Sequence, residues 1–410
     1  MLIDFDVDKY DGNTPIVVWG TGLIGGILQQ GLEKRDIIVS AFVDSIRKEV
    51  FCGKRIVMPK DLSEWYRKEK IIILIGVTAK RKEIEDILKD LKIERYYDAW
   101  NFIESLVEED DELRKASFHE WQRRESYLMY KWQIHNPQKL WIRSVDLVIT
   151  EKCSLKCRDC SNLMQYYTHP VNFDLEILKK GFDKFLDKVD RIGELRIIGG
   201  EPLMHPEFYK IVQWYKNCNK IGKIGVWSNG TIFPSEEVRE VLNVKKLWMR
   251  FSNYGQLSYH LSDWIKYCEE ENIDYEVNKM NKWHDLGELK KRNYSEETLK
   301  NIYQCCQCRN LPTFLNGRLY NCPYAANADN LRAMQQKDAV LDFIDFSNEN
   351  VDNTTADIKS FLEDREYLMA CDYCSGRNYE DGGVEPYIQV KEPLAYVSYE
   401  RERTELMKKV

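Results

Sequence analysis

The fold is decided by the stretch CSLKCRDC at residues 153–160, which places Cys153, Cys157 and Cys160 on one short loop. The stretch from Val145 to Ile149 comes just before this loop and is predicted to be a strand. Cysteine thiolates hold [4Fe–4S] clusters. Three thiols on a compact loop leave the fourth iron open, as at catalytic metal sites. The C-x3-C-x2-C spacing therefore favours a catalytic iron–sulfur cluster over the alternative, a zinc site with His169 as a possible fourth ligand.

Three further polar stretches follow predicted strands in the next part of the chain, and predicted helices separate them (175–189, 208–215, 238–242 and 261–270). A repeated βα pattern predicts an α/β fold with parallel strands, and βα barrels carry their active sites at the carboxyl ends of those strands. We therefore expect the three stretches to lie near the cysteine loop. They are Gly199-Gly200-Glu201-Pro202 after strand 195–198, Ser228-Asn229-Gly230 after strand 224–227, and Ser252-Asn253 after strand 247–251.

The cysteine loop and these stretches, in this order, resemble the radical S-adenosylmethionine (SAM) superfamily over about residues 141–285. The resemblance implies a partial (β/α)6 barrel in which the three cysteines hold a [4Fe–4S] cluster and the Gly-Gly-Glu stretch holds the SAM amino group. Asp159 stands where the family usually has an aromatic residue near adenine. The resemblance assigns SAM binding to Gly199, Gly200, Glu201, Pro202, Ser228, Asn229 and Ser252.

The resemblance also implies the chemistry. An electron from the reduced cluster cleaves a C–S bond of SAM, and the resulting 5′-deoxyadenosyl radical abstracts hydrogen from a C–H bond of the substrate. The cofactors carry this chemistry while the protein directs it and excludes water. An electron donor such as flavodoxin or ferredoxin is the expected partner.

A second cysteine group surrounds a predicted hairpin, residues 313–320, whose turn is Asn316-Gly317. It resembles the twitch half of the SPASM/twitch extension of radical SAM enzymes, which binds an auxiliary [4Fe–4S] cluster through C-x9–15-G-x4-C followed later by C-x2-C. No cysteine follows Cys374, so we expect one auxiliary cluster. The candidate ligands are Cys305, Cys306, Cys308, Cys322, Cys371 and Cys374.

Three cysteines are candidates for the first ligand of the auxiliary cluster. Cys305 and Cys306 fit the twitch spacing, and Cys308 falls one residue short of it. The spacing Cys305-x2-Cys308-x13-Cys322 also resembles the three-cysteine auxiliary site of the molybdenum-cofactor cyclase. We favour Cys308 because it leads directly into the hairpin. A thiol that is not a ligand could pack, or could donate hydrogen to a product radical, whereas a fully ligated cluster could accept an electron.

The N-terminal part carries a glycine motif, Gly20-x-Gly22-x2-Gly25, after the predicted strand 16–19, and Asp44 ends the next one, 37–43. This is the placement of a dinucleotide fingerprint, with helix N-terminal amides for a phosphate and a carboxylate for a ribose. The segment resembles small Rossmann-like domains of sugar-modifying enzymes from surface-polysaccharide clusters. It predicts a parallel sheet that binds a nucleotide or nucleotide sugar, with NAD binding or a purely structural turn as alternatives.

The patterns divide the chain into four parts. Residues 1–104 are the Rossmann-like domain, and 105–140 a connecting helix with Leu113, Trp121, Leu128 and Trp132 as buried contacts, or alternatively a partner-binding helix. Residues 141–300 are the radical SAM barrel. Residues 301–410 are the twitch domain and tail, in which the acidic stretch 338–357 is expected to be a surface insertion.

Composition limits the function classes. The 410 residues carry a formal net charge of −7, which argues against nucleic acid as the main partner. The longest clear apolar run, Ile71 to Ile75, is far below the roughly 18 residues of a membrane span. The N-terminus lacks the basic start of a signal peptide, so we expect a cytoplasmic protein. Disulfides are rare there, which favours metal ligation for most of the 12 cysteines; Cys52, Cys218 and Cys268 stand alone and are expected to pack as small apolar residues.

These observations predict a radical SAM oxidoreductase or isomerase that acts on a small polar metabolite, such as a sugar or nucleotide sugar. A peptide-modifying maturase is the alternative within the superfamily, although the N-terminal part resembles a Rossmann fold rather than a leader-binding domain. The alternative of another class is a ligand-binding protein with structural zinc, for which His169 is a candidate ligand.

Overall fold

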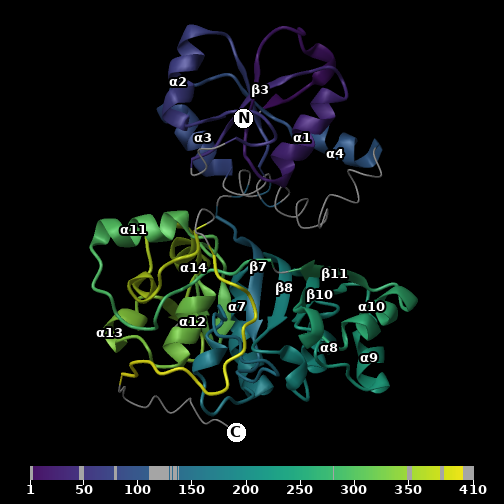
Figure 1. Ribbon diagram of the computed structural model, residues 1–410, viewed down its shortest axis with the longest axis vertical. Coiled ribbons are helices and arrows are strands. Elements are labelled where there is room, and N and C mark those ends of the chain that lie inside the picture. The colour runs from purple at the N-terminus through teal and green to yellow at the C-terminus, as the bar shows by residue number, and fades with distance from the viewer. Residues whose placement is uncertain are drawn as a thin grey trace. The chain divides into compact units, whose positions relative to one another are not determined.

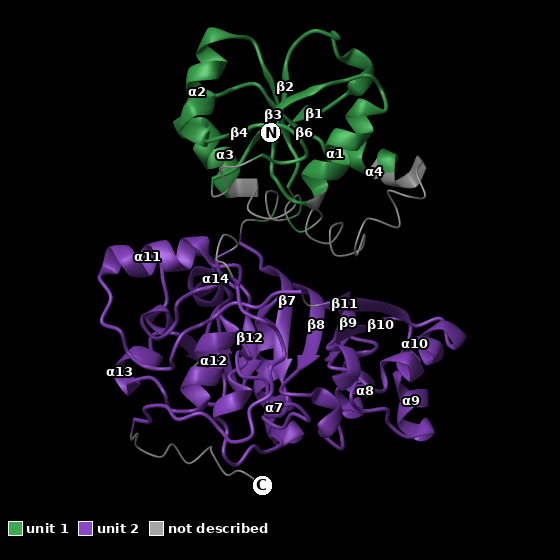
Figure 2. Cartoon of the chain, viewed as in Figure 1, with its two compact units in different colours: residues 1–136 green, residues 137–410 purple. Residues whose placement is uncertain are grey.

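The computed structural model describes residues 3–45, 50–77, 81–109, 129, 132, 136, 138–279, 281–348, 353–378 and 383–399. The chain forms two compact units, residues 1–136 and 137–410 (Figures 1 and 2). Most of the predicted connecting helix, with Leu113, Trp121 and Leu128, lies outside the described residues; α4 ends at Glu109. None of the helices in the described part of the chain has both the length and the apolar character that crossing a bilayer requires.

Unit 1 is a parallel six-stranded sheet with the order β1-β6-β5-β2-β3-β4. Side chains alternate between its faces, so that Ile16 and Val18 pack with α1 and α4 on one face while Val17 and Trp19 belong to the core on the other. Both faces are therefore apolar, as expected of a parallel sheet. The strands are Ile3–Asp4, Ile16–Trp19, Val39–Val43, Ile56–Val57, Ile72–Ile75 and Tyr96–Asp98 (β1 to β6), and the helices Leu23–Glu33, Pro59–Lys68, Arg81–Asp90 and Trp100–Glu109 (α1 to α4).

Unit 2 contains a mixed eight-stranded sheet with the order β11-β10-β9-β8-β7-β12-β13-β14. The first five strands in the sequence, β7 to β11, are mutually parallel neighbours, and β12 pairs in parallel with β7 on the opposite side from β8. These strands are Trp141–Val148, Arg191–Ile198, Ile221–Ser228, Leu247–Asn253, Asp274–Lys279, Thr313–Leu315, Arg318–Tyr320 and Phe343–Asp345 (β7 to β14).

Helices follow β7 to β10 in turn, which makes this part of unit 2 a βα repeat. Helices α8, α9 and α10 gather beside β8 to β11, and α11 to α14 lie toward the other end of the sheet (Figure 1). The helices are Leu175–Lys188 (α7), Tyr209–Tyr215 (α8), Glu236–Leu242 (α9), Leu261–Glu270 (α10), Glu296–Cys305 (α11), Pro323–Asn330 (α12), Gln336–Ala339 (α13) and Thr355–Glu363 (α14).

The hairpin β12–β13 joins the repeat to the second cysteine group. Its turn residues Asn316 and Gly317 both have positive φ, 49° and 79°, as a two-residue hairpin turn requires. Phe314 on β12 packs against Phe182 and Phe185 of α7, with ring centroids 5.3 and 5.9 Å away. The hairpin is therefore part of the same core as β7, so both cysteine groups are built on one sheet.

The acidic stretch after the hairpin is not the surface insertion that its composition predicts. Its residues 343–345 form β14, which pairs with β13. Asp342 is only 1% exposed and accepts hydrogen bonds from the amides of Met369 and Ala370. Acidic composition misled here because two backbone amides satisfy a buried carboxylate.

Candidate functional site

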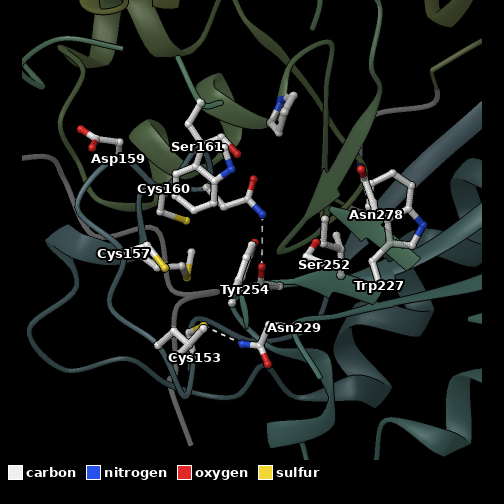
Figure 3. A pocket seen from close by; sticks show the side chains of 18 of the residues that line it. Cys153, Cys157, Asp159, Cys160, Ser161, Trp227, Asn229, Ser252, Tyr254 and Asn278 are labelled. Carbon is white, nitrogen blue, oxygen red and sulfur yellow. Dashed lines mark hydrogen bonds between the residues drawn. The ribbon is translucent and has the colours of Figure 1, made fainter. Parts of the chain in front are cut away.

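One cavity of about 370 Å³ lies at the carboxyl ends of the parallel strands of unit 2 (Figure 3). It brings together residues from four separate strand ends that the sequence analysis had selected. Backbone and side chains after β7, β8, β9 and β10 meet there, although they lie far apart along the chain. The selected residues that line it are Cys153, Cys157, Cys160, Gly199, Gly200, Ser228, Asn229 and Ser252.

The two glycines of this set allow the ends of β7 and β8 to approach closely. A Cβ atom at Gly199 would lie 2.5 Å from the carbonyl oxygen of Thr150, and one at Gly200 would lie 2.3 Å from that of Lys152. The amide of Gly200 donates to the Thr150 carbonyl, and that of Glu201 to the Lys152 carbonyl. The glycine stretch thus fixes the base of the cysteine loop.

Glu201 and Pro202 support the site without lining the cavity. Glu201 is fully buried, and its carboxylate accepts hydrogen bonds from the amides of Asn229, at 2.7 Å, and Leu203. Burial raises the pKa of this carboxyl to about 7. Asn229 in turn donates from Nδ2 toward the sulfur of Cys153, at 3.6 Å, and to Ser154 Oγ at 3.1 Å (Figure 3). Glu201 therefore acts through Asn229, because it holds the residue that contacts the thiol.

The three thiols of the loop are deeply placed. Burial raises the pKa of Cys157 to about 12 and raises those of Cys153 and Cys160 above their usual value. Without a cation these sulfurs therefore carry protons, and binding of iron would displace them. Asp159 also lines the cavity, and its carboxylate forms an ion pair of 2.9 Å with Arg158.

A C-terminal strap, residues 383–399, covers the cysteine loop, and nothing in the sequence pattern predicted it. Gln389 donates from Nε2 to the sulfur of Cys157 at 3.1 Å and accepts from the amide of Lys156 at 2.7 Å. The amide of Arg158 donates to the carbonyl of Ile388, and that of Val390 to the carbonyl of Lys156. The loop is therefore framed by a segment that lies 232 positions further along the chain.

Five cysteines line a second, narrow cavity beside the hairpin: Cys306, Cys308, Cys322, Cys371 and Cys374. Cys305 does not line it, and its sulfur instead faces Asn301 Oδ1 at 3.8 Å. Burial raises the pKa of Cys322 to about 12 and that of Cys374 to about 11. The hairpin and the distant C-x2-C pair thus supply a shared set of sulfur donors.

Arg377 connects this second set to the first cavity. Its guanidinium donates from Nη1 to the sulfur of Cys308 at 3.1 Å, and Arg377 also lines the larger cavity. A hydrogen bond from a cation favours the thiolate form of its acceptor. Arg377 thus counteracts the hydrogen bond with Cys306 and the burial that raise the pKa of Cys308, and its charge also lowers the pKa of Cys374.

The histidine that the sequence analysis offered as a zinc ligand lies apart from the cysteine loop's cavity. His169 is exposed and does not line the cavity of the cysteine loop.

The backbone of the glycine turn in unit 1 requires glycine at two of its three glycine positions and not at the third. Gly20 has a φ of +122°, and a Cβ at Gly25 would lie 2.1 Å from the carbonyl oxygen of Gly20, so both are required by the backbone. Gly22 has no such requirement, since its φ is −94° and a Cβ there would meet nothing within 4 Å. Asp44 accepts a hydrogen bond from the hydroxyl of Thr21, which places its carboxylate beside the turn.

Comparison with known proteins gives only distant likeness. No protein-family model and no curated protein matches the chain. Among solved structures it is similar to histidine-tagged anSMEcpe with bound AdoMet (18% identity, TM-score 0.28, 33% of this chain and 43% of that one). It is also similar to Streptococcus suis SuiB bound to S-adenosylmethionine (13%, 0.26, 57% and 60%) and to BtrN in complex with AdoMet and 2-DOIA (13%, 0.34, 62% and 100%). The chain spans less than half the length of the first, and likeness of this degree leaves the function to be inferred from the site.

Proposed function

We propose that this chain is a radical SAM enzyme, in which Cys153, Cys157 and Cys160 hold a [4Fe–4S] cluster. The observation that carries the proposal is the meeting of four strand ends around one cavity that one buried and two half-buried cysteines share. When bound, such a cluster supplies the electron that cleaves SAM to a 5′-deoxyadenosyl radical.

In this proposal the residues of the chain bind SAM, orient the cysteine thiols and shield the reaction from water. The backbone of Gly199 and Gly200 borders the cavity beside the thiols, where SAM would find carbonyls and amides rather than side chains. Asn229 orients Cys153, and Gln389 orients Cys157, each through a side-chain amide. Ser252 lies on the far side of Tyr254 from the cysteines, where a ribose hydroxyl would be in reach (Figure 3). The strap closes the loop against water, which protects a radical from side reactions.

We also propose one auxiliary [4Fe–4S] cluster, held by Cys308, Cys322, Cys371 and Cys374. The donor set supports this because five cysteines line the second cavity and four suffice. Cys306 is then the spare thiol; its sulfur accepts a hydrogen bond from the amide of Cys308. The reaction would be an oxidation or an isomerisation of a small polar metabolite, with flavodoxin or ferredoxin as electron donor. A peptide substrate is the alternative within the same chemistry.

Anaerobic reconstitution tests both clusters. We expect about eight irons and matching sulfide per chain, the stoichiometry of two cubanes, and formation of 5′-deoxyadenosine from SAM under dithionite. Protein that binds zinc, lacks sulfide and leaves SAM intact would instead be a zinc-stabilised binding protein.

Arg377→Met should lower the midpoint potential of the auxiliary cluster, because hydrogen bonds and positive charge at a ligand sulfur stabilise the reduced state. Loss of a charge-assisted hydrogen bond worth about 1.5–3 kcal/mol corresponds to a shift on the order of 60–130 mV for one electron. Potentiometric titration followed by electron paramagnetic resonance measures it. Arg365→Met is the control, since Arg365 donates to the carbonyl of Leu341 instead of a thiol. A full iron content with an unchanged potential would remove Arg377 from this role.

For unit 1 we propose binding of a nucleotide or nucleotide sugar at the glycine turn. The observation that favours it is Gly22, the N-cap of α1, which the backbone does not require to be glycine. A missing side chain at a helix N-terminus lets a phosphate approach the amides, and Asp44 is placed for a ribose hydroxyl.

Gly22→Val should leave unit 1 folded and weaken nucleotide binding, because a Cβ fits there without a clash but covers the turn. Gly25→Ala is the contrasting variant, and we expect it to destabilise the unit by about 1–3 kcal/mol through the clash with Gly20. Calorimetry with UDP-glucose and thermal unfolding distinguish the two effects. Equal nucleotide affinity in Gly22→Val and in the natural protein would make the turn structural.

A further inference from the structure

Two of the described strand residues that line the cavity of unit 2 each have a polar atom that is buried without a hydrogen-bond partner. One is Oδ1 of Asp146 on β7, a residue only 4% exposed, and the other is Nε1 of Trp227 on β9. Both residues line the cavity. Buried polar atoms are normally paired in folded proteins, and unpaired ones on residues that line a cavity mark a place where a ligand group can complete them. One of the two atoms accepts hydrogen bonds and the other donates one.

Charged neighbours hold the indole of Trp227 in place. Its ring lies between the guanidinium groups of Arg196 and Arg250, whose Cζ atoms are 4.6 and 4.2 Å from the ring centroid. Each arginine has a carboxylate of its own, Glu194 at 2.8 Å for Arg196 and Glu276 at 3.3 Å for Arg250. The ring is therefore clamped, and its N–H direction is set before any ligand arrives.

The unpaired carboxylate oxygen of Asp146 favours a ligand group that donates a hydrogen bond over an anionic one. Nη1 of Arg196 lies 3.6 Å from Asp146 Oδ1, which is beyond a hydrogen bond, so this oxygen keeps its capacity to accept one. A ligand group here must therefore give a hydrogen bond to a carboxylate and receive one from an indole. A hydroxyl group does both.

We propose that Asp146 and Trp227 form the substrate subsite of this cavity and that the substrate is a sugar ring whose adjacent hydroxyls pair with the two atoms. Asn278 also lines the cavity. Its side-chain amide can both donate a hydrogen bond to a hydroxyl group and accept one from it. Figure 3 shows Trp227 and Asn278 across the cavity from the three cysteines, with Ser252 and Tyr254 between. This leaves room between thiols and subsite for SAM. The inference rests on the proposed radical SAM function and names the substrate class for it.

The test uses the full chain, loaded anaerobically with both clusters and SAM. The probes are glucose, galactose, mannose and N-acetylglucosamine, and saturation-transfer difference NMR reports binding. We expect at least one sugar to bind. Asp146→Asn should weaken it by up to about a hundredfold and Trp227→Phe by roughly tenfold, as for a charge-assisted and a neutral hydrogen bond. Trp214→Phe is the matched control, because Trp214 lies on α8 and does not line the cavity.

The outcomes separate the subsite from the proposed function. If the natural protein cleaves SAM reductively but binds no sugar, or if both variants bind the sugar as well as it does, the subsite is overturned and the radical SAM function stands. If the natural protein does not cleave SAM, the proposed function fails whatever sugar binds. Trp227→Phe keeps the test decisive should Asp146→Asn not fold, since it removes the indole N–H, keeps an aromatic ring and creates no new buried charge.

Discussion

Replacing Cys153, Cys157 and Cys160 together by Ala should abolish formation of 5′-deoxyadenosine under dithionite. No other thiol lines the cavity in the described part of the chain, so the variant has no means of holding a catalytic cluster there. About four of the expected eight irons should remain, because the auxiliary donors are untouched. Chromatographic assay of 5′-deoxyadenosine and an iron determination on the same sample measure both effects.

The matched control for this triple variant is Cys52→Ser combined with Cys218→Ser. These cysteines line neither cavity, and their replacement should change neither iron content nor SAM cleavage. Reductive cleavage of SAM by the triple variant at the natural rate would show that the catalytic cluster had been placed on the wrong cysteines.

Single replacement of Cys308, Cys322, Cys371 or Cys374 by Ala should remove about four irons and leave the rest. Each of these thiols lines the second cavity, and a cubane that loses one of four ligands is lost as a unit. Cys305→Ala and Cys306→Ala serve as controls that should keep full iron, the first because its thiol faces Asn301. Iron analysis and electron paramagnetic resonance of the reduced protein distinguish one cluster from two.

Two results would contradict this ligand set in different ways. Full iron in Cys308→Ala with loss in Cys306→Ala would exchange the first ligand and the spare thiol within the same cavity. Loss in Cys305→Ala would mean that α11 must end differently when iron is bound, since Cys305 is its last residue.

Much of the βα repeat in unit 2 could be predicted from the sequence, because its mainly apolar strands are followed by stretches rich in cysteine, glycine, serine or asparagine. Helix 175–189 was predicted and α7 spans 175–188, with Asp174 accepting from two amides of its first turn. Strand 195–198 was predicted and β8 begins earlier, at Arg191, because Glu194 and Arg196 are charged yet buried as a pair. From sequence alone, a charged residue in a strand is expected to be exposed to solvent, because its ion-pair partner is not known.

The parts that escaped prediction depend on contacts between distant segments. Strands β1, β4 and β6 have only two or three residues each, too few to show a period of two. The subsite of Asp146 and Trp227 and the two arginines around it unite four strands, β7 to β10, whose side-by-side order cannot be derived from the sequence. The strap lies in a charged segment without periodicity, and its contact with the thiols of the cysteine loop is a single glutamine.

The strap bears on how such a protein matures. Translation produces the cysteine loop long before Gln389, which is 232 positions downstream of the thiol that it contacts. Cys371 and Cys374 likewise emerge well after the hairpin that they join. A nascent chain therefore exposes its first three thiols while both cysteine-lined cavities are still unfinished. During that interval oxygen or stray metal can reach these thiols before Gln389 and the later cysteines have been made.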